Sequence, residues 1–422
     1  MNIRINNREI AVLDGETVIE TMRRAGFDVP SLCYAKDAKH RSSCMVCAVK
    51  NCETEQMMPS CTTLPVEGMS IDSECDGVQL TRTLSLELLL SDHRADCEAP
   101  CRMACPAGMD VAAMNRLYDR KKYDEALALL RDTLVIPATL CYICHAPCEK
   151  ICRRGDLDRA VAIREIKKEL VARTDLETVD APASNGRKVA VTGSGPASLS
   201  AACHLRRQGF DVTVFEPSDA VLTPYLPAGA VPEDVVSLEI EAIRRTGVRF
   251  VCNAGNIRPE DFERVVTLQT RSKQPARMIA EGLAAVSEKA VRPFNSTFPR
   301  FSEAEKKTVA VQGEKSGCLY CDCEKKGDCR LRRFASEYQI KGSRYLKGSV
   351  SEALRRQEIG NGLRFEPAKC IRCGLCVYNS DNGFTFKGRG FMMQVVLPEE
   401  NRGNVPDMLA DLCPTGAIYR NE

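Results

Sequence analysis

Hydrophobic and polar residues alternate at the start of the chain, and the pattern then changes period. The stretches Asn2 to Ile5 and Glu9 to Leu13 alternate on either side of Asn6-Asn7, which predicts two short strands joined by a turn. Helical spacing follows from Glu16 to Ala25, where a glycine ends it. We therefore expect residues 1–78 to form a small domain of strands and one helix.

Helical spacing dominates the next region, residues 79–178. Apolar residues recur with a helical period in Gln79 to Leu90, Asp110 to Leu134 and Ala160 to Arg173. Proline, serine, asparagine and glycine then gather in Thr174 to Gly186, which indicates a linker. This region is expected to be a helical domain.

The period changes once more after the linker. Lys188 to Glu216 has the order strand, glycine turn, helix, strand, which is how a dinucleotide-binding fold begins. We place this domain at 187–294, and a loose stretch from Pro293 to Phe301 leads into a last domain at 295–422. The fold class expected for the whole chain is multidomain α+β.

Composition narrows the classes of function. The chain has 422 residues with 59 Lys and Arg against 57 Asp and Glu, a formal net charge of +2, and no tryptophan. Neither a basic surface nor an aromatic stacking surface for nucleic acid is expected. The first residues do not resemble a signal peptide, and no run of about 18 apolar residues occurs, so we expect a cytoplasmic protein with no membrane span.

The cysteines indicate the chemistry. There are 23 of them, and all but Cys52, Cys75, Cys203 and Cys252 fall into four groups with short spacings. Cysteines that bind a metal must converge, whereas cysteines used as core residues scatter. A disulfide framework is the alternative, but it is typical of short secreted chains, so metal ligation is expected here.

The first group suits a two-iron cluster. Its members are Cys33, Cys44, Cys47 and Cys61. A two-iron cluster takes two thiolates per iron, whereas a zinc ribbon, the alternative, usually has two C-x2-C knuckles. Residues 1–78 resemble the ferredoxin-like domain of the complex I large iron–sulfur subunit, which also occurs in iron-only and NAD-linked hydrogenases and formate dehydrogenases. The resemblance implies a β-grasp domain with one [2Fe-2S] cluster, although Ser42-Ser43 stands where that family usually has glycine.

The second group suits two four-iron clusters, which need eight ligands. Its seven cysteines are Cys97, Cys101, Cys105, Cys141, Cys144, Cys148 and Cys152. His93 lies four residues before the first of them and is expected to supply the eighth ligand, since a neutral imidazole can bind iron. A surface histidine is the alternative.

This stretch resembles the helical domain of the glutamate synthase small subunit and of dihydropyrimidine dehydrogenase, in which early and late cysteines share two cubanes. The resemblance implies one cluster on His93, Cys97, Cys101 and Cys152. It implies a second on Cys105, Cys144 and Cys148. The position of that family's Glu or Gln ligand is Lys167, which has no lone pair to donate, so Cys141 is expected to complete the second cluster, with Glu165 or Glu169 as alternatives.

The glycine loop predicts dinucleotide-binding ancestry. Gly193 makes the turn, Gly195 lets the backbone approach a pyrophosphate, Ser198 takes the place of the third glycine, and Glu216 ends the second strand where a ribose would bind. In the glutamate synthase family a complete NADPH domain interrupts the flavin domain. Here too few residues separate the corresponding elements, so the resemblance implies a truncated FAD-type domain that either binds FAD or is kept as a scaffold.

Two groups remain in 295–422. The first is Cys318, Cys321, Cys323 and Cys329; it resembles a cubane loop of the complex I subunit, and a structural zinc is the alternative. The second is Cys370, Cys373, Cys376 and Cys413, the last followed by proline, which is typical of a bacterial ferredoxin cubane. Ser380 stands where a second cubane would need another cysteine, so we expect one [4Fe-4S] cluster in a C-terminal ferredoxin-like domain.

One [2Fe-2S] and about four [4Fe-4S] clusters, with no catalytic residue that the sequence singles out, predict an electron-transfer subunit, because clusters move single electrons whereas nicotinamides move hydrides. The resemblances imply a soluble NAD(P)-linked complex of the hydrogenase, formate dehydrogenase or ferredoxin-coupled type, which could be electron-bifurcating. Its partners would be a flavin (FMN) diaphorase subunit with its small [2Fe-2S] subunit, and a hydrogenase, formate dehydrogenase or ferredoxin. The alternatives are an FAD-dependent oxidoreductase active on its own and a structural or regulatory iron–sulfur scaffold.

Overall fold

The computed structural model describes residues 1–93, 95–173, 182–270, 272–287, 315–323, 325, 327–340 and 356–420. Most of the predicted linker Thr174 to Gly186, and all of Pro293 to Phe301, lie outside these residues. The chain divides into two compact units, of which the first is Met1–Cys97 together with Cys323–Glu422 and the second is Glu98–Asp322. The second unit is therefore inserted in the sequence of the first. The predicted division into four domains is finer and stays a prediction.

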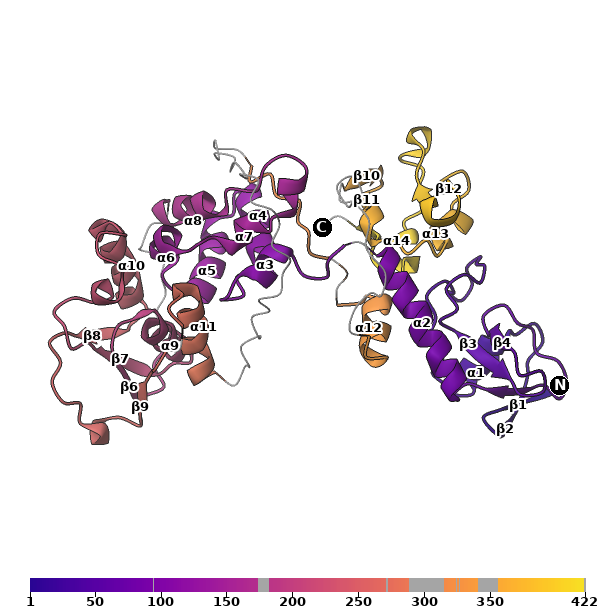
Figure 1. The fold of residues 1–422 in the computed structure, drawn as a ribbon, viewed down its shortest axis with the longest axis horizontal. Helices are drawn as coiled ribbons and strands as arrows, with labels where there is room; N and C mark the ends of the chain where they lie inside the picture. The colour runs from indigo at the N-terminus through magenta and orange to yellow at the C-terminus, as the bar shows by residue number, and fades with distance from the viewer. Residues whose placement is uncertain are drawn as a thin grey trace. The chain divides into compact units, whose positions relative to one another are not determined.

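The first unit begins with a mixed five-stranded sheet. Its strands are β1 (Asn2–Ile5), β2 (Arg8–Ala11), β3 (Ala48–Asn51), β4 (Met57–Pro59) and β5 (Ser70–Asp72), in the order β2-β1-β5-β3-β4. Strands β1 to β4 are labelled in Figure 1. The hairpin of β1 and β2 confirms the first two predicted strands. Helix α1 (Val18–Arg24) packs Val18, Ile19 and Met22 into the core that the sheet residues Ile3 and Ile5 also join.

Helix α2 (Asp76–Asp92) follows the sheet and confirms the predicted helix around Gln79 to Leu90. Its buried Arg82 donates two hydrogen bonds to the carbonyl of Ala48, with Nη2 at 2.9 Å and Nε at 3.1 Å. A buried guanidinium needs such partners, and here they fix the helix to β3. The end of α2 carries His93.

The C-terminal part of the first unit holds a second small core. Strands β10 (Gln357–Gly360), β11 (Leu363–Phe365) and β14 (Ile418–Arg420) form an antiparallel sheet, and β12 (Thr385–Lys387) pairs with β13 (Gln394–Val396) in an antiparallel hairpin. The helices of this part are α12 (Arg330–Glu337), α13 (Leu375–Tyr378) and α14 (Leu409–Leu412).

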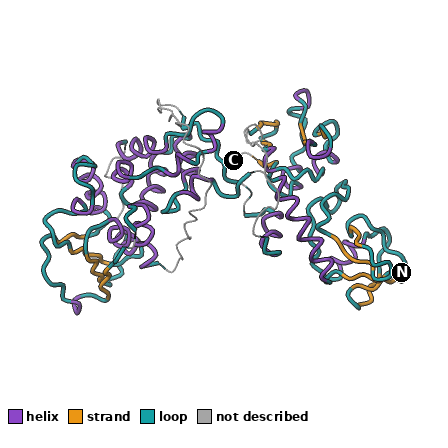
Figure 2. The backbone as a smooth tube through the Cα atoms, in the orientation of Figure 1, coloured by secondary structure: helices purple, strands orange, loops and turns teal. Residues whose placement is uncertain are grey.

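The second unit opens with helices, which are purple in Figure 2. They are α3 (Pro100–Ala104), α4 (Val111–Asp119), α5 (Tyr123–Leu134), α6 (Pro137–Ile143), α7 (Pro147–Lys150) and α8 (Ile163–Ala172). The helical spacing predicted over Asp110 to Leu134 is confirmed as two helices, because the chain turns back at Lys121, whose φ is +60°, and α5 packs on α4 through the ring pair Tyr118 and Tyr123. None of the described helices alone has the length and apolarity to span a bilayer; α5 and α6 pass that test only as a pair bent by 66°.

A four-stranded parallel sheet completes the second unit. The strands β6 (Lys188–Thr192), β7 (Asp211–Phe215), β8 (Arg249–Val251) and β9 (Arg264–Thr267) have the order β8-β7-β6-β9, and the helices are α9 (Pro196–Arg207), α10 (Glu233–Arg245) and α11 (Pro275–Val286). This confirms the predicted strand, glycine turn, helix and strand. Helices α9 and α11 approach so closely that a Cβ on Gly282 would lie 2.0 Å from the carbonyl oxygen of Ala197.

The helices and the sheet of the second unit share one hydrophobic core. A buried carboxylate also joins them, because Glu239 of α10 accepts hydrogen bonds from the amides of Ala138 (2.6 Å) and Thr139 (2.8 Å) at the start of α6. Amides in the first turn of a helix lack partners within the helix, so this carboxylate caps α6 from a distant element. Burial raises the pKa of Glu239 to about 7 although these hydrogen bonds oppose the shift.

Candidate metal centres

The first cysteine group closes into one site of the first unit. The side chains of Cys33, Cys44, Cys47 and Cys61 are all buried. Hydrogen bonds from Cys44 and Cys61 lower the pKa of the Cys33 thiol, and a hydrogen bond from Cys61 lowers the pKa of Cys47 to about 6. The amide of Ser43 also points at the Cys33 sulfur, at 3.5 Å. Four thiols in mutual contact with an amide donor fit a two-iron cluster.

The C-terminal group forms a second set in the same unit. The amide of Arg372 donates to the sulfur of Cys370 at 3.3 Å, and the amide of Ile418 donates to the sulfur of Cys413 at 3.5 Å. Burial raises the pKa of Cys370 to about 12, and the nearby thiol of Cys413 adds to the shift. Burial and neighbouring thiols likewise raise the pKa of Cys373 and of Cys376.

A third set of the first unit contains cysteines from two predicted groups. The amide of Cys323 donates to the carbonyl of Cys97 at 3.2 Å. Burial raises the pKa values of Cys323 and Cys329, and the thiol of Cys97 adds to both shifts. His93 is buried at the end of α2, four residues before Cys97.

In the second unit, Cys101 lies near cysteines of the helical region and near cysteines at the end of the inserted segment. Burial raises its pKa, and the thiols of Cys318, Cys148, Cys152 and Cys321, in that order, add to the shift. The side chains of Cys101, Cys152 and Cys318 pack against the same core. Cys318 and Cys321 thus belong to one unit and Cys323 and Cys329 to the other, which differs from the single group that their spacing predicts.

The remaining cysteines of the second unit surround Lys167. Burial alone would lower the pKa of this ammonium group, but the negative charge at Cys148, Cys141, Cys105 and Cys144 outweighs it and raises the pKa. The two alternative ligands are engaged elsewhere, because Glu165 lies 3.3 Å from Lys168 and Glu169 accepts a 2.6 Å hydrogen bond from Tyr118. The arrangement favours Cys141 as the fourth ligand, and Lys167 as a buried counter-charge that sequence reasoning noted only as a non-ligand.

None of the described residues forms a group of three or more His, Cys, Asp or Glu side chains arranged as a single metal ion requires. A cluster makes a different demand, since its thiolates bind two or four separate irons and the sulfurs stand around the cluster rather than around one point. The sets above are therefore candidates for clusters, and ligation itself stays a prediction.

The glycine loop is covered by a residue of its own domain. An ideal Cβ on Gly195 would lie 3.0 Å from Cδ1 of Tyr225, and one on Gly193 would lie 2.9 Å from its hydroxyl oxygen. The Tyr225 hydroxyl donates to Glu216 at 3.0 Å. The surface that would approach a pyrophosphate, between the loop and the strand-end acid, is thus in contact with a tyrosine ring.

The carboxylate of Glu216 is fully engaged within the protein. It accepts 2.7 Å hydrogen bonds from the amide and the hydroxyl of Ser194, and bonds of 2.9 and 2.8 Å from the amide and hydroxyl of Ser218. Burial would raise its pKa, but these donors and Tyr225 outweigh burial and lower it. Ser198 donates to the carbonyl of Thr192 at 2.9 Å. Sequence reasoning missed Tyr225, since no motif marks a tyrosine ten residues after the strand.

Comparison with known proteins identifies three segments. Residues 1–75 match the model of a 2Fe-2S iron-sulfur cluster binding domain, residues 91–178 that of dihydropyrimidine dehydrogenase domain II with a 4Fe-4S cluster, and residues 191–221 that of an NAD(P)-binding Rossmann-like domain. The chain therefore contains 2Fe-2S-type, 4Fe-4S-type and Rossmann-like domains.

Three similar proteins are oxidoreductase subunits by name. The chain is 30% identical over 286 residues to the NADP(+)-dependent formate dehydrogenase subunit beta of Moorella thermoacetica, which covers 57% of this chain and 39% of that protein. It is 28% identical to the NADPH-Fe(3+) oxidoreductase subunit beta of Geobacter sulfurreducens, over 36% of this chain and 24% of that protein. It is 28% identical to the NAD-dependent dihydropyrimidine dehydrogenase subunit PreT of Escherichia coli O157:H7, over 45% of this chain and 47% of that protein.

The chain spans less than half the length of these relatives. Among solved structures, a chain of an NAD+-reducing [NiFe]-hydrogenase in the H2-reduced state aligns with 99% of this chain and 86% of its own length, at 12% identity and a TM-score of 0.40. At that TM-score the alignment adds nothing to the assignment of this chain.

Proposed function

We propose that this chain is an iron–sulfur electron-transfer subunit of an NAD(P)-linked oxidoreductase complex. The proposal is supported by the matched 2Fe-2S and 4Fe-4S domains and by relatives that are named as subunits of such enzymes. Bound clusters would supply one-electron steps, which a hydride carrier alone does not.

The observation that carries the proposal is the packing of three cysteine sets of the first unit in one hydrophobic cluster. Cys33 and Cys44 of the two-iron set, Cys329 of the third set and Cys373 of the C-terminal set contact that cluster. The thiol of Cys33 also raises the pKa of Cys373, and the thiol of Cys413 raises that of Cys329. Clusters in these sets would follow one another as two-iron, C-terminal and Cys329 sites, which suits stepwise transfer of electrons.

Contacts between the cysteine-bearing loops hold this order. Lys39 and Asn379 exchange two hydrogen bonds, from the Lys39 amide to Oδ1 at 2.9 Å and from Nδ2 to the Lys39 carbonyl at 2.7 Å. The amide of Ala95 donates to the carbonyl of Ala368 at 3.1 Å, which joins the His93–Cys97 segment to the C-terminal set. Polar contacts of this kind fix the loops relative to one another within the first unit.

The Rossmann-like domain is, in this proposal, a scaffold for the cluster-bearing helices rather than an FAD site. Tyr225 lies on its glycine loop, and Glu216 is satisfied without a ribose. Its α10 caps α6, which carries Cys141. The alternative is that the chain alone is an enzyme that oxidises NAD(P)H at this domain. The contact of Tyr225 with the glycine loop argues against this alternative.

The partners proposed are a flavin diaphorase subunit with its small [2Fe-2S] subunit and a hydrogenase, formate dehydrogenase or ferredoxin. The test is made on anaerobically purified chain, by counting iron, sulfide, zinc and flavin and by electron paramagnetic resonance (EPR) after reduction. About eighteen irons without flavin, no reduction by NAD(P)H alone, and reduction once a diaphorase is added are expected. Stoichiometric FAD with turnover of NAD(P)H by the chain alone would establish the alternative instead.

A further inference from the structure

We propose that Cys101, Cys152, Cys318 and Cys321 together hold one four-iron cluster inside residues 98–322. The segment Cys318-Leu-Tyr-Cys321 would thereby complete a site whose other two ligands belong to the helical domain. The inference rests on the proposed function in that the bound group is taken to be an iron–sulfur cluster.

The segment that carries Cys318 is anchored on α4 at its first residues. Asp119 accepts hydrogen bonds from the amide of Ser316 at 2.5 Å, from its hydroxyl at 2.8 Å, and from the hydroxyl of Tyr320. Residues on both sides of Cys318 thus bind one carboxylate, which fixes the sulfur between them.

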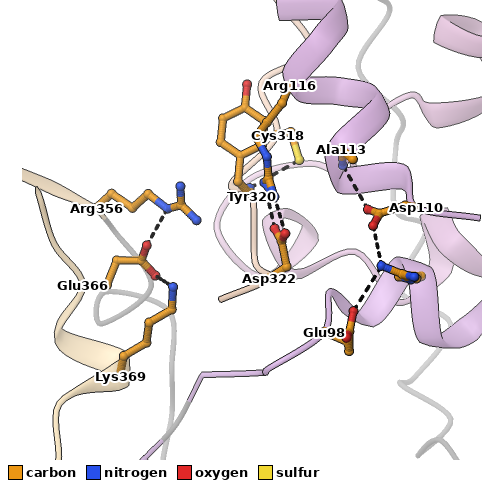
Figure 3. A network of polar contacts seen from close by, with 11 residues as sticks. Glu98, Asp110, Ala113, Arg116, Cys318, Tyr320, Asp322, Arg356, Glu366 and Lys369 are labelled. Atoms are coloured by element: carbon orange, nitrogen blue, oxygen red, sulfur yellow. Dashed lines mark hydrogen bonds and ion pairs between the residues drawn. The ribbon is translucent and has the colours of Figure 1, made fainter. Parts of the chain in front are cut away.

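The end of the segment is held by a second contact with the same helix. Arg116 donates to both carboxylate oxygens of Asp322, one of them at 2.9 Å, and its guanidinium lies 5.4 Å from the centre of the Tyr320 ring (Figure 3). A bidentate pair of arginine and carboxylate fixes direction as well as distance. Cys321 is thereby held beside α4.

Arg154 joins the segment to the loop that carries Cys152. Its Nη1 donates to the carbonyl of Gly317 at 2.6 Å, and a Cβ on Gly317 would collide with this nitrogen at 1.4 Å. Arg154 also donates to both carboxylate oxygens of Asp158, at 2.9 and 3.0 Å, which holds the guanidinium in place. One side chain, two residues after Cys152, therefore binds the backbone next to Cys318.

The turn at Cys318 has the geometry of the turn at Cys370. In each, the residue two after the cysteine has a left-handed backbone, with φ of +49° at Tyr320 and +57° at Arg372, and its amide donates to the cysteine sulfur at 3.3 Å. A sulfur that accepts an amide hydrogen bond in a tight C-x2-C turn is pre-arranged as a thiolate ligand.

A buried amide also points to a missing partner at this site. Asn115 is 1% exposed, and neither amide atom has a partner at full hydrogen-bond geometry among the described residues; the Cys318 thiol lies beside it as the acceptor that its NH2 group would reach. A buried amide without partners is costly, and the sulfide or thiolate of a cluster would accept its hydrogen bond.

Assigning these four cysteines to one cluster also leaves every other predicted ligand in a complete set of four. Cys105, Cys141, Cys144 and Cys148 surround Lys167 as a second set of the same unit. His93, Cys97, Cys323 and Cys329 then form the third set of the first unit. Each four-ligand set lies within one unit, whereas the grouping expected from spacing would share ligands between the two.

The test uses full-length chain purified without oxygen, with Cys101→Ala, Cys152→Ala, Cys318→Ala and Cys321→Ala, and Cys323→Ala as the matched control. Iron and sulfide are counted, and EPR spectra of the reduced proteins are compared. Each of the four single variants is expected to lose about four irons and the same EPR signal. The double variant Cys101→Ala with Cys318→Ala is expected to lose no more iron than either single variant, because both residues bind the same cluster. Cys323→Ala is expected to lose a different signal.

Loss of one common signal by Cys318→Ala and Cys323→Ala, with a different loss by Cys101→Ala, would overturn the inference and restore a single 318–329 site. If Cys318→Ala does not accumulate, Cys321→Ser, which keeps an oxygen ligand, is expected to shift the same signal that Cys101→Ser shifts; shifts in separate signals would also overturn it. Wild-type chain without iron would instead refute the proposed function, so the two failures are distinct.

Discussion

The amide of Cys323 donates a hydrogen bond to the carbonyl of Cys97 at 3.2 Å, although the whole of 98–322 lies between them in the sequence. The two sequence segments of the first unit, which end at Cys97 and begin at Cys323, are therefore in contact where the second unit is inserted between them. Cys97 and Cys323 are both candidate ligands of one set, so the junction itself would be part of a metal site.

Replacing residues 98–322 by a two-residue linker is expected to leave a folded first unit. The ends to be joined already lie in hydrogen-bond contact, so the linker closes a short gap with little strain or loop entropy. The expected product binds about ten irons, from one two-iron and two four-iron clusters. Cys97→Ala in the shortened chain is the control and should remove about four of them; a shortened chain with about six irons before that change would contradict the ligand set.

Lys167→Met is expected to lower the reduction potential of one four-iron cluster. A reduced cluster carries one more negative charge, and the buried ammonium group among Cys105, Cys141, Cys144 and Cys148 stabilises it. The shift should be on the order of 100 mV, measured by a redox titration followed by EPR. Lys150→Met, also near Cys148 but exposed, is the matched control and should change the potential far less. Equal small shifts would contradict the counter-charge role.

Glu239→Gln is expected to remove a pH dependence of stability. The folded-state pKa of Glu239, about 7, is raised above the usual 4.5, so its contribution is fully present below about pH 4.5 and is lost as the pH rises through 7. Between pH 6 and 8 the wild-type protein should lose roughly 1 kcal/mol of unfolding free energy through this group, and the glutamine variant should not. Glu241→Gln, on the same helix but paired at the surface with Arg245, is the control. Parallel curves for wild type and Glu239→Gln would refute the effect.

Tyr225→Ala is expected to expose the glycine loop and to create measurable FAD binding that the wild-type chain lacks. The ring lies against the loop, so its removal opens the space in front of Gly193 and Gly195. Tyr225→Phe keeps the ring and loses only the hydrogen bond to Glu216, so it should stay without flavin. Binding is measured by flavin fluorescence quenching with added FAD. Equal binding by wild type and Tyr225→Ala, or none by Tyr225→Ala, would show that the ring does not control the site.

The sequence predicts local features of this protein well, because turns, periodicity and cysteine spacing act over a few residues. The β1–β2 hairpin, the order of elements around Gly193 and the contact of Cys33 with Cys44 and Cys61 all follow from such patterns. The insertion does not, because spacing treats Cys321 and Cys323 as neighbours whereas they belong to different units. The contact of Tyr225 with the glycine loop could not be predicted for a related reason, since a contact between a loop and a ring has no periodic signature in the sequence.

The nested order of the two units has a consequence for how the protein is made. A ribosome completes His93 and Cys97 early, but Cys323 and Cys329 emerge only after residues 98–322 have been synthesised. The inserted unit likewise waits for Cys318 and Cys321 near its own end. Before these residues are synthesised, both sites on the nascent chain would thus lack two of their four ligands. Both ligand sets would be completed during the same short stretch of translation. Premature termination before residue 318 would yield a product with both sites incomplete and their remaining thiols open to oxidation.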